Sequence, residues 1–176
     1  MIRLSKKLRE KKAVQTEETL QVVVFQIGEE EYAVDILQVQ EIIRPQEIVP
    51  MPQAPDFVKG MINLRGHAIP VIDLRERLGV SPSETSDGSA TRIIIVRVEE
   101  ALVGMIVDEV SHVLRIPKSA IEPPPATIVG SASEYITGIA KVEDRLIVLL
   151  NISKILSAEE RVALVGIHKQ LSQQGN

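Results

Sequence analysis

The chain has 176 residues, of which 44% are hydrophobic, 2% are aromatic and none is cysteine. That is enough apolar sequence for one domain or two small ones with packed cores, while the lack of cysteine excludes disulfides, thiolate metal sites and cysteine nucleophiles. Residues 1–12 carry six basic side chains against one glutamate, so the rest of the chain is acidic. An acidic body disfavours a nucleic acid partner, and no apolar run approaches the length that crosses a bilayer.

The basic segment at the start predicts a tail rather than a targeting signal. A secretory signal needs an apolar stretch behind its charges, and none follows here. We therefore expect residues 1–18 to be a basic, mobile tail, and the protein to be cytoplasmic. We expect the folded part to span residues 19–168, with a second tail at 169–176.

The first half of the folded part reads as short strands separated by turns. A hairpin is expected where Gly28 and three glutamates separate the apolar runs 20–27 and 32–36. Another turn at 63–66 leads into a strand near 67–72. Asp73, with Glu76 three residues later, predicts the start of a short helix.

The second half repeats this pattern after a connector. Residues 81–90 hold no large apolar side chain and suit a linker between two units. Glu143-Asp144-Arg145 predicts a turn before a strand at 146–150. Ser157 with Glu160 predicts a capped C-terminal helix of about ten residues.

An internal repeat connects the two halves. Segment 58–78 matches segment 136–156 at an offset of 78, and segment 24–44 matches 95–115 at an offset of 71. Two copies are too few for a solenoid, so we expect one small β unit duplicated and packed against its copy. The predicted fold class is all-β with minor helix, in two similar subdomains of about five strands each, as in small closed barrels.

Candidate catalytic and metal-binding residues are few. The three histidines (His67, His112, His168) have no metal-ligand spacing, and phosphate-binding glycine motifs are absent. Three aspartates (Asp35, Asp73, Asp108) border strands or helix starts, where a carboxylate ordinarily serves as a cap or turn acceptor. We expect no catalytic residue, metal or cofactor, and no enzymatic activity.

Surface candidates remain. Arg65 lies in a tight turn, where its guanidinium could meet a partner's carboxylate or be a solvated turn cation. Val39, Ile42 and Ile43 alternate with polar residues, so some could face an apolar patch, although core burial is the ordinary role of such residues.

Several stretches together resemble the CheW-like domain family of chemotaxis coupling proteins, over roughly residues 20–165. The matching segments are 23–42, 57–66, 69–75, 103–110 and 134–138. The resemblance implies two intertwined five-stranded β-barrels with a shared hydrophobic interface. It also implies a non-catalytic adaptor that links the cytoplasmic tips of methyl-accepting chemoreceptors to the regulatory domain of the histidine kinase CheA, in arrays that reach the membrane only through the receptors.

The resemblance also suggests where the partners bind. The receptor-binding residues would be those around the groove between the barrels, namely Val39, Glu41, Ile43, Asn63, Leu64, Arg65 and Gly66. The kinase-binding residues would lie at barrel ends, namely Gly60, Val103, Gly104 and Val107. Two alternatives stay open from sequence: a CheW-like module in a non-flagellar chemosensory pathway, and a β-barrel of another class that binds nucleic acid or acts as an enzyme.

Overall fold

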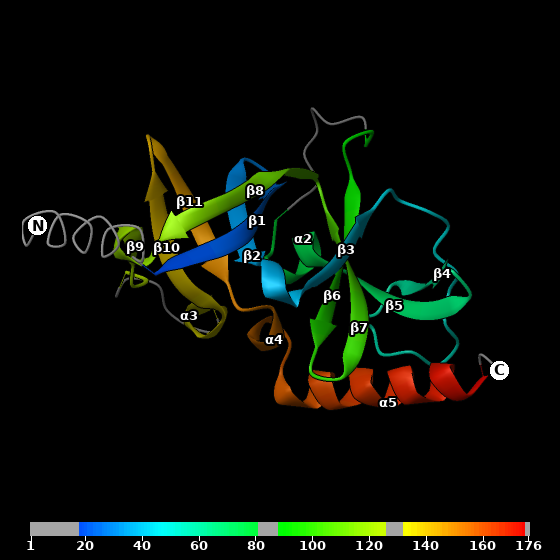
Figure 1. Ribbon diagram of the computed structural model, residues 1–176. Coiled ribbons are helices and arrows are strands. Elements are labelled where there is room, and N and C mark those ends of the chain that lie inside the picture. Colours follow the sequence, from blue (N-terminus) through cyan, green and yellow to red (C-terminus); the bar gives the residue numbers. More distant parts are fainter. Residues whose placement is uncertain (1–17, 81–87, 126–131, 175–176) are drawn as a thin grey trace, which may run out of the picture.

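The computed structural model describes residues 18–80, 88–125 and 132–174, and these form two β-sheets (Figure 1). The six-stranded sheet has the order β8-β1-β2-β11-β10-β9. Its strands are β1 (Thr19–Ile27), β2 (Glu30–Asp35), β8 (Glu109–Pro117), β9 (Ile121–Glu122), β10 (Ile136–Val142) and β11 (Arg145–Leu150). The five-stranded sheet has the order β3-β6-β7-β5-β4. Its strands are β3 (Val39–Ile43), β4 (Gly60–Leu64), β5 (His67–Asp73), β6 (Arg92–Val98) and β7 (Ala101–Val107).

Short helices connect the strands. They are η1 (Ile36–Gln38), α2 (Leu74–Arg77), η2 (Lys118–Ala120), α3 (Ala132–Tyr135) and α4 (Ile152–Ile155), followed by the long α5 (Ala158–Gln174). The predicted all-β class with two subdomains and a C-terminal helix is confirmed. None of the helices in the described residues is long and apolar enough to span a membrane.

The repeat is present, but its two copies exchange strands. In the first copy the order along the chain is β1, β2, β3, β4, β5 and α2; in the second it is β6, β7, β8, β10, β11 and α4. The six-stranded sheet takes β1 and β2 from the first copy and β8, β10 and β11 from the second, and the five-stranded sheet takes the opposite set. The duplicated β unit is therefore present, and the two subdomains are intertwined because each is built from strands of both copies.

Equivalent pairings show how closely the two subdomains correspond. Ala33 pairs in parallel with Leu149, and Gly104 pairs in parallel with Val71. These pairs are related by the same offsets of 71 and 78 that relate the sequences. The two-residue strand β9, which pairs with β10, has a counterpart in the isolated bridge between Val49 and Met61. This is why one sheet counts a sixth strand.

The apolar core has three parts because successive side chains of a strand point to opposite faces. From β1, Val22 and Val24 belong to the cluster of the six-stranded sheet, whereas Val23, Phe25 and Ile27 belong to a larger cluster that both sheets share. A third cluster belongs to the five-stranded sheet. The shared hydrophobic interface expected from the resemblance is thus present.

Polar contacts also join the subdomains. The Asp108 carboxylate accepts a hydrogen bond from the backbone amide of Gly28 at 2.7 Å and another from Arg75 at 3.2 Å. Arg75 in turn donates two side-chain hydrogen bonds of 2.9 Å to Asp73. Asp73 caps α2 and Asp35 caps η1, so the structural roles expected for the three aspartates are confirmed.

The C-terminal helix differs from its expected length. Ser157 and Glu160 form the predicted capping box, in which each side chain accepts the other's backbone N–H, at 3.1 and 2.9 Å. The helix then continues to Gln174, well past ten residues and into the segment expected to be a tail. Residues 1–17 and most of the expected linker at 81–90 lie outside the described residues.

Candidate functional site

The turn between β4 and β5 presents Arg65 toward β3. Arg65 has a φ of 52°, and the Asn63 side-chain oxygen accepts the Gly66 amide at 2.8 Å, which holds the turn. The Arg65 guanidinium donates two hydrogen bonds to the Glu41 carboxylate, at 2.7 and 2.6 Å. Five of the seven receptor-binding candidates, Glu41 and residues 63–66, therefore lie together. The donor fork that could meet a partner is held by a residue of this chain.

This ion pair joins two edges of one sheet. Glu41 is on β3 and Arg65 follows β4, and these strands are the opposite edges of the five-stranded sheet. The contact thus brings the edges around toward each other, as in a barrel. Arg65 remains 70% exposed as a side chain and Glu41 only 23%, so the cation is accessible at the surface while paired.

The ion pair also fixes the charge state of both side chains. The hydrogen bond and the positive charge of Arg65 lower the pKa of the Glu41 carboxyl below 4.5, and Glu41 raises the pKa of the Arg65 guanidinium. Opposite charges at hydrogen-bond distance favour the ionised forms. The site therefore presents a fixed, oriented guanidinium at its surface near neutral pH.

The apolar candidates at this site are half-buried. Val39 packs against the shared core, whereas Ile43 and Leu64 pack against the cluster of the five-stranded sheet. They can offer only part of their surface to a partner. Val39, which the resemblance places at the groove, therefore also takes part in the packing around the shared core.

Leu37 is the exposed apolar residue that sequence analysis missed. It lies in η1, where the chain passes from β2 in one sheet to β3 in the other, and it is 88% exposed. Its backbone amide donates to Asp35 at 2.9 Å, so a short aspartate-capped turn holds it out of the strand alternation. The Asp35-Ile36-Leu37 segment could have indicated this exposure from sequence, because an aspartate that ends an apolar strand often caps a turn.

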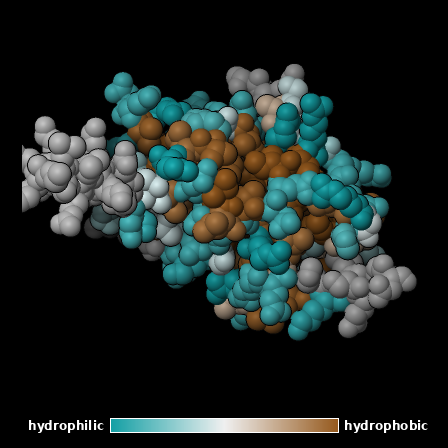
Figure 2. All heavy atoms as spheres, viewed as in Figure 1, coloured by the Kyte–Doolittle hydropathy of each residue, from teal (hydrophilic) through white to brown (hydrophobic). Residues whose placement is uncertain are grey.

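Other large hydrophobic side chains are also exposed. Val113 on β8 is 48% exposed and Ile42 on β3 is 39% exposed. Figure 2 shows a broad hydrophobic area on the face where β1, β8 and β3 lie in Figure 1. An exposed apolar area of this kind with polar residues around it is typical of a protein-binding surface.

The kinase-binding candidates lie in the interior. Val103 and Val107 are fully buried, and Gly60 and Gly104 are buried as well. Cβ atoms added at the two glycines would come within 2.5 Å of the Val49 carbonyl oxygen and within 2.9 Å of the Ile93 side chain, respectively. These four residues support the packing of β4 and β7, and they are not themselves available for contact.

Residues with catalytic potential are not brought together in the described parts of the chain. No group of three or more His, Asp or Glu side chains there could hold a metal ion. His67 is exposed, and His112 lies 3.5 Å from Arg145, which pairs with Glu31 at 3.2 Å. The side chain of His168 is outside the described set.

Comparison with known proteins gives one consistent family. A family model described as the CheW-like domain matches residues 21–160. The chemotaxis protein CheW of Klebsiella aerogenes is 39% identical over 150 residues, covering 84% of this chain and 87% of that protein. The CheW protein of Treponema pallidum is 34% identical over 153 residues, covering 86% and 90%.

A solved structure agrees with these matches. The scaffolding protein TtCheW from Thermoanaerobacter tengcongensis superposes with a TM-score of 0.70 at 37% identity. The match covers 81% of this chain and 96% of that one. Both sequence and fold are therefore similar over most of the length.

Proposed function

The chain belongs to the CheW-like domain family, and we propose that it couples methyl-accepting chemoreceptors to the histidine kinase CheA as a non-catalytic adaptor of chemotaxis signalling. The match to the family model over residues 21–160 is the observation that carries this proposal. The alternative of a nucleic-acid-binding β-barrel has no comparable support.

The receptor would bind the surface formed by Leu37, Val39 and the Arg65–Glu41 ion pair. Leu37 is an exposed apolar anchor, and Arg65 is an accessible cation held in one orientation. A helical hairpin that presents apolar residues at helical spacing and a carboxylate matches this combination. The half-buried Val39 would form part of the floor beneath such a helix.

The kinase would bind elsewhere on the two subdomains, through its own CheW-like regulatory domain. Gly60, Val103, Gly104 and Val107 would then act indirectly, by holding β4 and β7 in the shape that the kinase meets. Separate receptor and kinase surfaces allow one adaptor to bridge both partners. Several weak contacts would together hold an array on the cytoplasmic side of the membrane.

Sedimentation with receptor-containing membranes tests this function. We expect the protein to pellet with membranes that contain receptor and to stay in the supernatant with membranes that lack it. Adding CheA should bring the kinase into the pellet only when this protein is present, and should raise kinase autophosphorylation. Kinase recruitment without this protein, or no pelleting with receptor, would reject the proposal.

A further inference from the structure

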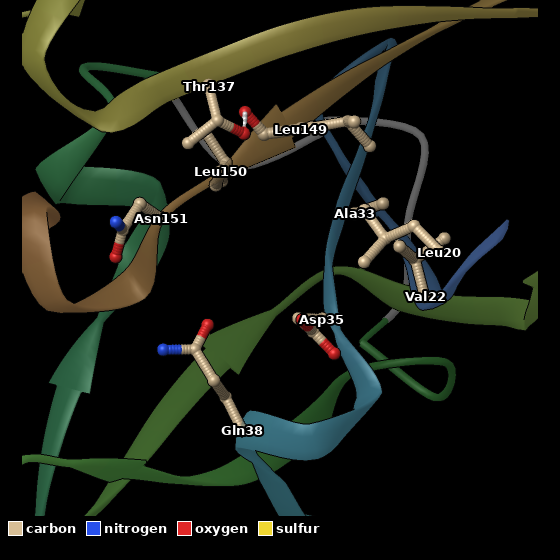
Figure 3. A pocket seen from close by; sticks show the side chains of 9 residues that line it. All are labelled: Leu20, Val22, Ala33, Asp35, Gln38, Thr137, Leu149, Leu150 and Asn151. Carbon is tan, nitrogen blue, oxygen red and sulfur yellow. Dashed lines mark hydrogen bonds between the residues drawn. The ribbon is translucent and has the colours of Figure 1, made fainter. Parts of the chain in front are cut away.

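A cavity of about 350 Å³ opens at one end of the six-stranded subdomain. Its apolar lining comes from β1, β2 and β11, and includes Leu20, Val22 and Leu149. Asp35, Gln38 and Asn151 supply polar groups, which Figure 3 shows gathered on one side of the space. The volume is at the low end for ligand pockets, which suits a single long side chain.

The internal repeat explains why this cavity exists. The position equivalent to Asp35 in the five-stranded subdomain is Ile106, which is buried in that subdomain's own cluster. Aspartate is shorter, and one oxygen of the Asp35 carboxylate accepts a hydrogen bond from the amide of Leu37. The six-stranded subdomain therefore lacks the side chain that fills the same place in its counterpart.

A second difference between the copies concerns the residues that follow the last strand of each. Asp73 is equivalent to Asn151, and in the five-stranded subdomain Asp73 holds the Arg75 guanidinium by two hydrogen bonds of 2.9 Å. The residue equivalent to Arg75 is Ser153, whose backbone amide donates to Asn151 at 3.1 Å. Serine has no guanidinium, so the Arg75–Asp73 pair has no equivalent at Asn151. The Arg161 guanidinium donates instead to the backbone carbonyl of Ser153 at 2.7 Å.

The charge of the lining favours a cation. Asp35 is the one acidic or basic residue among the nine that line the cavity. Arg115 lines the neighbouring hollow, which Asp35 and Leu37 also border. One Asp35 oxygen accepts a hydrogen bond from Leu37, and the other accepts none from the described residues.

We propose that this cavity receives an arginine side chain from a partner protein. The aliphatic stem would lie against Leu20, Val22 and Leu149. The planar guanidinium would donate to the Asp35 carboxylate and to the side-chain oxygens of Gln38 or Asn151, as Arg75 does with its acids in the other subdomain. Several acceptors around one planar fork favour arginine over lysine.

The test uses N-acetyl-arginine-N-methylamide as the probe, followed by chemical shifts in ¹H–¹⁵N spectra of the full chain. The amide of Leu37 is the reporter, because it donates to Asp35. We expect saturable shifts at Leu37 and at the Asn151 side-chain amide. The neutral citrulline analogue should bind at least about tenfold more weakly, because it lacks the charge.

Two matched variants complete the experiment. Asp35→Asn keeps an oxygen to cap η1 but removes the charge, so it should weaken arginine binding at least about tenfold. Asp56→Asn removes the same charge from an exposed loop residue and should leave binding unchanged.

Three outcomes would overturn the proposal. The first is equal binding of the arginine and citrulline probes, the second is binding that Asp35→Asn leaves unchanged, and the third is shifts of residues 1–12 in Asp35→Asn without any probe. The last would mean that the chain's own basic segment is the occupant. Neither receptor nor kinase is present, so the result does not depend on the function proposed above.

Discussion

The carboxylate of Asp108 accepts the backbone amide of Gly28 at 2.7 Å, although 80 positions separate them in sequence. Asp108 stands where the chain leaves β7 of the five-stranded sheet for β8 of the six-stranded sheet. Gly28 lies in the turn between β1 and β2. Since Arg75 contacts the same carboxylate, one buried group ties a strand turn of one subdomain to a helix of the other.

Loss of this carboxylate should destabilise the whole domain. Asp108→Ala leaves the Gly28 amide without its acceptor and removes one of the two acids that hold Arg75. We expect the free energy of unfolding to fall by about 2–4 kcal/mol. Asp108→Asn should lose less, because an amide oxygen still accepts from Gly28. Urea denaturation measures both, and equal stability of Asp108→Ala and the unchanged protein would refute the role.

Leu37 should matter for receptor binding and little for stability. It is 88% exposed, so Leu37→Asp removes an apolar anchor and adds a charge without disturbing the core. We expect strongly reduced sedimentation with receptor membranes and an unchanged melting temperature. Val162→Asp is the matched control, since Val162 is 71% exposed on α5. Equal binding of the two variants would move the receptor surface elsewhere.

Val39→Asp should behave differently from Leu37→Asp. Val39 is half-buried against the shared core, so an aspartate there places a charge partly in apolar surroundings. We expect both receptor binding and the melting temperature to fall. If thermal unfolding is unaffected, Val39 lies more fully in the groove than its packing indicates.

Exchanging the charges of the Arg65–Glu41 pair separates its contribution to stability from its contribution to receptor binding. Arg65→Glu alone places two carboxylates side by side and should weaken receptor binding while the fold persists, because exposed ion pairs contribute little to stability. The double variant Arg65→Glu with Glu41→Arg restores the pair in reverse. We expect it to recover the melting temperature but not receptor binding. Full recovery of binding would mean that the receptor does not recognise the positive charge of Arg65.

The pH dependence of this pair has a defined sign. The pKa of Glu41 is lowered in the folded protein from the ordinary 4.5, so its contribution is present above that value and is lost as the pH falls through the lowered pKa. Side-chain carboxyl shifts should show Glu41 titrating below its ordinary value of 4.5. In Arg65→Ala its pKa should return to the ordinary value, and an unchanged titration would contradict the geometry.

Two glycines allow strain and crowding to be compared. Gly60 has a φ of 152°, and an added Cβ would lie 2.5 Å from the Val49 carbonyl oxygen. Gly66 has a φ of 86°, with nothing within 4 Å of the same atom. Gly60→Ala should therefore lower the melting temperature much more than Gly66→Ala. A loss of kinase coupling in Gly60→Ala without any loss of stability would instead favour direct contact.

Much of the local structure could be predicted because its causes are local. Turn residues at 28–31 and 63–66, and the capping box of Ser157 with Glu160, depend on side chains a few positions apart. The strand exchange between copies could not be predicted in this way, because the repeat has the same sequence signature whether a strand pairs within its own copy or with the other. The pairing of Arg65 with Glu41 was missed for a related reason, since it depends on how far the five-stranded sheet curls.

The sequence predicted which apolar residues are buried less well than it predicted local structure. The alternation of β3 suggested that Val39 could face an apolar patch, and the structure packs part of its surface against the core. The glycines and valines assigned to a kinase surface are interior residues. A family motif shows that a residue matters, but burial decides whether it acts by contact or by packing.

The exchange of strands has a consequence for how the chain can be divided. A cut between residues 80 and 88 would leave each fragment with strands whose partners are on the other fragment, so neither should fold alone and the two should assemble when mixed. Pairings that are so distant in sequence also predict slow folding. By the same geometry, a single copy of the repeat could complete its sheets only with a second molecule, as a symmetric dimer with exchanged strands. The present chain then corresponds to such a dimer joined into one polypeptide.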